Sequence, residues 1–134
     1  MDKHTLQIFE NSLARCNAES TFLEQFYETF LASSPKVREK FKDTDFTRQK
    51  RALRASFHIM LLAAEHEDSP ERYLKELAHR HSRQDLAIGA ELYDLWIDSL
   101  LATVRKVDPE FNAEVEQAWE SVTMVGVSYL LSHY

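Results

Sequence analysis

Glycine and proline are scarce in this chain. Only two glycines and three prolines occur among its 134 residues. An antiparallel β-fold relies on these two residue types in the tight turns between its strands. Apolar residues recur instead at helical spacing, as in the run from Phe22 to Leu31. We therefore predict an all-α fold. The length is close to the commonest domain size and predicts a single domain over residues 1–134.

Capping and turn residues divide the chain into seven expected helices. We expect Ser20 and Thr47 to cap the second and fourth helices, and Pro35 to lie in the first turn of the third. Residues 83–89 are expected to be irregular. Helices of such unequal length favour an irregular helical sandwich over a four-helix bundle. The expected ranges are 4–17, 21–32, 35–41, 48–65, 70–81, 90–107 and 112–134.

The charge and the cysteine content restrict the class of protein. The formal net charge is −6, which argues against nucleic acid and anionic membranes as partners. The single cysteine, Cys16, cannot form an intrachain disulfide and is expected in the apolar face of the first helix. The N-terminal sequence MDKHTLQ lacks the apolar core of a signal peptide. The longest mainly apolar stretch, 122–131, has about half the length that a membrane crossing requires. We expect a cytoplasmic protein.

Two helix faces could together enclose a flat ligand. Leu77 and His81 lie one turn apart on the expected helix 70–81, and an imidazole in that position can either pack or ligate a metal. Gln49, Leu53 and Phe57 recur at i, i+4 and i+8 on the expected helix 48–65. One face thus carries an imidazole and the other an amide among apolar groups. We interpret the pair as the two walls of a haem site.

A histidine taken alone is more often packed or exposed than bound to a metal. His79 is two residues from His81, so the two side chains point in nearly opposite directions and cannot reach one metal. We expect His79 and His58 to face solvent. The charged stretches 36–42 and 48–54 are most simply solvated faces, from which Lys42 or Arg48 could pair with a haem propionate, as could Arg83.

Four short motifs, taken in order, resemble the globin family, in particular bacterial single-domain haemoglobins and the globin half of flavohaemoglobins. FYETF at 26–30 with SPKVREKF at 34–41 resembles the segment joining the second and third globin helices. RQKRAL at 48–53 is similar to the start of the distal helix. LAHRH at 77–81 matches the end of the proximal helix, and LY at 92–93 opens the next one. The resemblance covers residues 22–130.

The resemblance implies a role for each matching residue. His81 would be the proximal iron ligand, and Phe41 would stack on the macrocycle. Tyr27 and Gln49 would be the distal hydrogen-bond donors to a gas ligand, and Tyr93 would lie near the proximal side. The implied cofactor is haem b, iron protoporphyrin IX. The residues expected to contact it are Phe41, Leu53, Phe57, Leu77, His81, Ile88 and Tyr93.

The implied function is reversible binding of O2, NO or CO, for storage, sensing or reductase-dependent NO detoxification. The last helix lacks the late glutamate that supports the proximal histidine in flavohaemoglobins, which argues against a peroxidase-like site. We expect no flavin or nicotinamide domain, so re-reduction of the iron would require an external reductase. We expect an oxygen-binding protein rather than an enzyme, as a monomer or homodimer. The alternative is a haem-free globin-like module that acts through protein contacts or signalling.

Overall fold

The computed structural model describes residues 1–82 and 87–134, and these residues form seven helices and no strand. The all-α prediction is confirmed. The helices are α1 (Lys3–Asn17), α2 (Phe22–Ser33), α3 (Pro35–Lys40), α4 (Phe46–Glu65), α5 (Glu71–His81), α6 (Ala90–Val107) and α7 (Ala113–Ser132). Of the stretch expected to be irregular, residues 87–89 are indeed outside the helices, and residues 83–86 lie outside the described residues.

Short polar side chains start several of these helices. The carboxylate of Asp45 accepts hydrogen bonds from the backbone N–H groups of Thr47 and Arg48 and so caps α4. The cap predicted at Thr47 is therefore two residues too late, because the carboxylate of Asp45 accepts from the free backbone N–H groups at the start of α4. The cap predicted at Ser20 is also wrong, since Thr21 occupies that position in α2. Pro35 does lie in the first turn of α3, as predicted.

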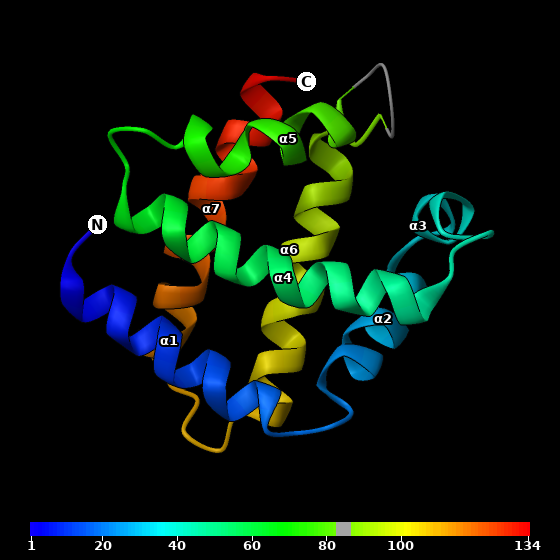
Figure 1. Cartoon of the computed structure of the whole chain (residues 1–134). Coiled ribbons are helices and arrows are strands. Elements are labelled where there is room, and N and C mark those ends of the chain that lie inside the picture. Colours follow the sequence, from blue (N-terminus) through cyan, green and yellow to red (C-terminus); the bar gives the residue numbers. More distant parts are fainter. Residues whose placement is uncertain (83–86) are drawn as a thin grey trace.

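The helices form two crossed layers (Figure 1). Helices α1, α4 and α5 make one layer, and α2, α6 and α7 make the other. Between the layers, α4 and α5 both pack on α7, and α1 also packs on α7. Within the layers, α4 contacts α5, and α2 contacts α6. In the described part of the chain, no helix is long and apolar enough to cross a membrane.

An aromatic cluster of Phe9, Phe22, Phe57 and Trp119 joins the two layers. All four side chains are buried, and the ring of Trp119 lies 4.7 Å from Phe9, 5.5 Å from Phe57 and 6.4 Å from Phe22, measured between centroids. The edge-to-face geometry of these pairs adds about 0.5–1.5 kcal/mol each beyond the burial of apolar area. The cluster contributes one residue from each of α1, α2, α4 and α7 and fixes how these helices cross.

A buried polar network ties the end of α6 to α1. Asp108, which directly follows α6, accepts hydrogen bonds from Arg15 Nε at 2.6 Å and from Ser12 Oγ at 2.6 Å. The indole N–H of Trp119 donates to the same Ser12 oxygen at 2.8 Å. Cys16 is buried on the same helix, as predicted, and burial raises the pKa of its thiol to about 12.

Gly126 allows α7 to approach α4 closely. A Cβ atom at this position would lie 3.0 Å from Cγ of Met60, which is tighter than ordinary side-chain packing. Met60 in turn lines the cavity described below. The absence of a side chain at Gly126 therefore determines where one part of the cavity wall lies.

Candidate functional site

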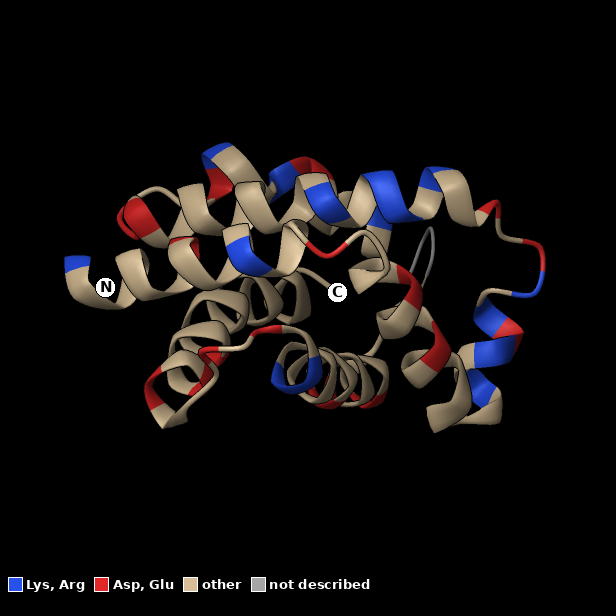
Figure 2. Ribbon diagram, turned by 90° about the horizontal axis from the view of Figure 1, so that it is seen from below, with Lys and Arg blue, Asp and Glu red and all other residues tan. Residues whose placement is uncertain are grey.

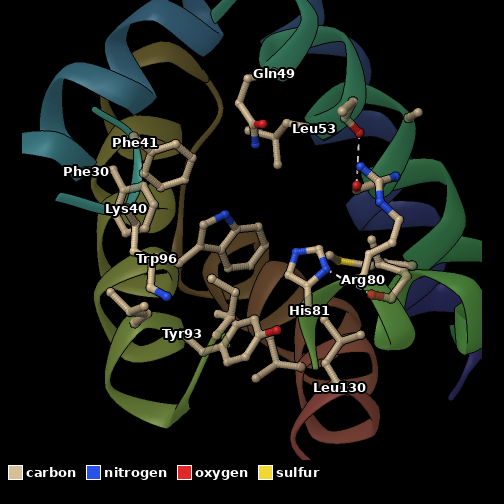
Figure 3. A pocket seen from close by; sticks show the side chains of 18 of the residues that line it. Phe30, Lys40, Phe41, Gln49, Leu53, Arg80, His81, Tyr93, Trp96 and Leu130 are labelled. Carbon is tan, nitrogen blue, oxygen red and sulfur yellow. Dashed lines mark hydrogen bonds between the residues drawn. The ribbon is translucent and has the colours of Figure 1, made fainter. Parts of the chain in front are cut away.

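A cavity of about 340 Å³ lies between α4 and α5, and residues of α2, α3, α6 and α7 complete its wall (Figure 3). This volume is within the range of small-molecule and cofactor sites. Most of the wall is apolar, and a few polar side chains point into it, which is the usual composition of such sites. The apolar lining includes Phe30, Phe41, Leu53, Ile59, Met60, Leu77, Ile88, Leu92, Trp96, Val127 and Leu130.

His81, in the last turn of α5, has a fixed protonation pattern. Its Nδ1 atom lies 2.9 Å from the carbonyl oxygen of Leu77, one turn earlier in the same helix. A carbonyl can only accept a hydrogen bond, so Nδ1 must donate and carry the ring proton. The lone pair of the neutral imidazole is then on Nε2, the nitrogen that is needed for metal ligation. The Leu77 carbonyl thus orients the ring as well as selecting its tautomer.

Across the cavity from His81 lie Gln49 and Leu53, both from α4 (Figure 3). Tyr27 reaches the same cavity from α2 and is only 4% exposed. Burial raises the pKa of the Tyr27 phenol to about 12, and a hydrogen bond with Gln49 acts in the opposite direction with smaller effect. The phenol therefore stays neutral near pH 7 and keeps a proton to donate.

Aromatic rings hold Tyr27 in place. Its ring lies 5.3 Å from Phe46 and 6.0 Å from Phe41, measured between centroids and in edge-to-face geometry. Phe41 and Phe46 themselves stack at 6.2 Å, which joins the end of α3 to the start of α4. Contacts of this kind restrict the rotation of Tyr27, so its hydroxyl occupies a defined place in the cavity wall.

Tyr93, near the start of α6, lines the cavity and carries a buried hydroxyl. Its ring stacks on His81 with centroids 6.5 Å apart and an interplanar angle of 26°. The buried hydroxyl has no hydrogen-bond partner among residues 1–82 and 87–134, and burial raises the pKa of the phenol. Buried hydroxyls without a partner are rare in folded proteins, and those that occur often lie at functional sites.

The structure brings together eight of the nine residues that were expected around the cofactor. The eight that line the cavity are Tyr27, Phe41, Gln49, Leu53, Leu77, His81, Ile88 and Tyr93. The ninth, Phe57, is not brought to the cavity. It is fully buried in the aromatic cluster between Phe22 and Trp119. His58 and His79 are exposed, as predicted.

Within residues 1–82 and 87–134, the basic residues at the cavity differ from those considered from the sequence. Lys40 and Arg80 line the cavity, from α3 and α5 (Figure 3). Lys42 instead pairs with Glu39 on the surface, Arg48 is absent from the lining, and Arg83 lies outside the described residues. The sequence holds no local signal for Lys40 or Arg80, because their approach depends on how α3 and α5 pack.

Comparison with known proteins identifies the family. The family model for globins matches residues 24–130, so the chain is a member of the globin family. A Pseudomonas aeruginosa protein, whose crystal structure is described as highly homologous to a human hemoglobin, is 39% identical with a TM-score of 0.91. The match covers 97% of this chain and 98% of that one. No curated protein matches the chain. Membership of the globin family implies a haem cofactor.

Proposed function

We propose that this globin binds haem b in the cavity between α4 and α5 and uses it to bind a diatomic gas reversibly, with O2 as the principal ligand. The observation that carries the proposal is the position of His81, whose imidazole is oriented by the Leu77 carbonyl and faces Gln49 and Leu53 across an apolar cavity.

His81 would hold the iron through Nε2, and the hydrogen bond from Nδ1 to Leu77 would keep the ring from rotating. Haem supplies an iron with one further coordination position, at which a gas can bind and leave. Leu77 lies one turn before His81 and would pack on the same side of the macrocycle. Phe41 and Leu53, which also line the cavity, would supply further apolar contacts to the macrocycle.

Tyr27 and Gln49 would stabilise the gas ligand by hydrogen bonds. O2 carries partial negative charge when it binds to ferrous haem, and both a phenol and an amide can donate to it. A hydrogen bond to a charged group contributes about 1.5–3 kcal/mol, which is roughly a 10- to 150-fold change in the dissociation constant. We expect slow O2 release, with Tyr27 as the stronger donor because its side chain is almost completely buried.

Lys40 and Arg80 are suited to pair with the two haem propionates. Both line the cavity, and they come from different helices. A cation beside a carboxylate forms a charge-assisted hydrogen bond. Both lysine and arginine are exposed here, so each pair would contribute no more than about 1 kcal/mol. Arg80→Met should therefore speed the transfer of haem to a scavenger protein by up to about fivefold.

Haem binding is tested by titrating the purified protein with hemin. We expect one equivalent of hemin to produce an intense Soret band, and a pyridine haemochrome spectrum to identify haem b. His81→Ala should abolish or strongly weaken the band. His79→Ala, on the same helix but exposed, is the matched control and should leave the band unchanged. A protein that takes up no hemin would contradict the proposal and favour a haem-free globin-like module.

A further inference from the structure

Positive charge is concentrated in one part of this acidic protein. Residues 36–54 contain eight of the 16 lysines and arginines but only three of the 22 acidic residues. The rest of the chain keeps eight basic and nineteen acidic residues, a formal charge of −11. Seven of these basic residues belong to α3 and the first half of α4, and Lys42 lies in the turn between them; the two helices are at the same end of the molecule (Figure 2).

Three arginines of α4 contribute charge that no carboxylate pairs with in the described residues, as does Arg38, whose guanidinium donates to the Leu31 carbonyl. Lys36, Lys42 and Lys50 pair with Glu91, Glu39 and Glu24. Arg48, Arg51 and Arg54 are exposed, and no ion pair to them occurs within residues 1–82 and 87–134. Their spacing of three residues places neighbouring guanidinium groups close together on the helix surface.

The arginines adjoin the mouth of the cavity. Arg48 is one turn before Ala52, and Arg51 is one turn before Ala55. Ala52 and Ala55 both line the cavity and are exposed, so they lie where the cavity opens to solvent. An edge of a macrocycle bound in the cavity would be within easy reach of a protein docked on these arginines.

We propose that the surface formed by Arg48, Arg51 and Arg54, here called the basic rim, docks an acidic electron-carrier protein that re-reduces the haem. This inference rests on the proposed function. One electron passes from the reduced carrier to the ferric iron, so the carrier is oxidised by one electron and the iron becomes ferrous. No bond forms or breaks in the protein, and no other reactant is needed.

The charge distribution favours a compact acidic protein as the partner. A long polyanion such as nucleic acid, or an extended anionic membrane, would also approach the surface that carries the charge of −11 and would be repelled there. A small protein with one acidic face can meet the basic rim alone. Opposite charges steer such encounters and raise the association rate, and interfaces for electron transfer are small and transient.

The test measures reduction of the ferric holoprotein by a reduced acidic flavodoxin in a stopped-flow instrument. The variant is Arg51→Glu with Arg54→Glu, and the matched control is Lys75→Glu with Lys106→Glu, two exposed lysines outside the basic rim. Both double variants change the net charge equally. The neutral semiquinone of deazariboflavin serves as a reductant that needs no docking.

At low ionic strength we expect the basic-rim variant to lose about tenfold or more of the flavodoxin rate, while the control keeps most of it. The difference should vanish at about 1 M salt, where the Debye length is roughly 3 Å. Equal losses in both variants, or a rate independent of salt, would overturn the proposal. In a second readout, chemical-shift changes on adding flavodoxin to the ¹⁵N-labelled protein should centre on residues 48–54.

The neutral reductant distinguishes a failure of the docking proposal from a failure of the proposed haem-binding function. It should reduce the wild type and both variants at the same rate, because the haem site is unaltered in all three. A protein without haem would give no absorbance change with either reductant, which would contradict the proposed function. The chemical-shift changes would still decide whether flavodoxin docks on the basic rim.

Discussion

The rings of His81 and Tyr93 stack in the cavity wall, and the described part of the chain offers the buried hydroxyl of Tyr93 no hydrogen-bond partner. An unpaired buried hydroxyl costs about 1–3 kcal/mol relative to its exposure to water in the unfolded chain. Removing it should therefore stabilise the protein when the cavity holds no cofactor. We expect Tyr93→Phe to raise the free energy of unfolding of the apoprotein by about 1 kcal/mol, measured in urea.

Tyr129→Phe, at a half-buried position on α7, is the control for this prediction and should change stability little. A loss of stability in Tyr93→Phe would show that the hydroxyl is hydrogen-bonded in solution.

Tyr27 is predicted to govern the release of O2. Tyr27→Phe keeps the ring and its contacts with Phe41 and Phe46 but removes the donor. We expect the O2 dissociation rate of the ferrous protein to rise about tenfold or more, measured by stopped-flow displacement with CO. Tyr73→Phe, outside the cavity lining, should leave the rate unchanged. A Tyr27→Phe protein with the wild-type rate would exclude Tyr27 as a donor.

Asp108 is predicted to make stability depend on acidic pH. Burial raises the pKa of its carboxyl, but hydrogen bonds from Arg15, Ser12 and the backbone N–H of Glu110 outweigh this effect, so the pKa is lowered overall. The folded state thus binds the proton less readily than the unfolded state, whose carboxyl titrates near 3.9. The stabilisation of the folded state by ionised Asp108 is therefore fully present above about pH 4, and it is lost as the pH falls through the lowered pKa.

The variant Asp108→Asn should therefore lose about 2 kcal/mol or more of unfolding free energy at pH 7, and this difference from wild type should shrink below about pH 4. Urea unfolding of the apoprotein across this pH range measures both effects. Asp98→Asn, at an exposed position on α6, provides the control. If the stability difference between Asp108→Asn and wild type stayed constant with pH, the charge of Asp108 would not be the source of the stabilisation.

Gly126 is predicted to affect the cavity although it does not line it. Gly126→Val would force Met60 to move, and Met60 lines the cavity. We expect a loss of about 1–3 kcal/mol in stability and weaker hemin binding in a spectroscopic titration. Gly89→Ala is the matched control, since its Cβ would come no closer than 3.9 Å to another side chain. Unchanged hemin binding in Gly126→Val would show that Met60 moves away from the cavity.

Local patterns in the sequence were sufficient to predict the helices and one pair of residues on each of two cavity walls, whereas the roles of Tyr27, Phe41 and Tyr93 followed from the resemblance to globins. Periodicity and helix breakers give the seven helices, and i, i+4 spacing pairs Leu77 with His81 and Gln49 with Leu53. The pattern failed at Phe57. A helix turns by 100° per residue, so a residue at i+8 is rotated by about 80° from its starting point. That rotation turns Phe57 away from Gln49 and into the aromatic cluster.

Features that depend on packing between helices could not be read from the sequence. The approach of Lys40 and Arg80 to the cavity follows from the positions of α3 and α5. The two charged stretches look like ordinary solvated faces until the fold brings them to one end of the molecule. The orphaned state of the Tyr93 hydroxyl likewise depends on which groups surround it in three dimensions.

The aromatic cluster around Trp119 contains none of the cavity-lining residues, and it already links four helices from both layers. Collapse of the newly made chain can therefore proceed before any prosthetic group arrives. The core would form first, and haem binding would then be a separate step that rearranges only the cavity beside α5. Cells short of iron would therefore accumulate a folded apoprotein that can still bind haem, instead of an unfolded polypeptide.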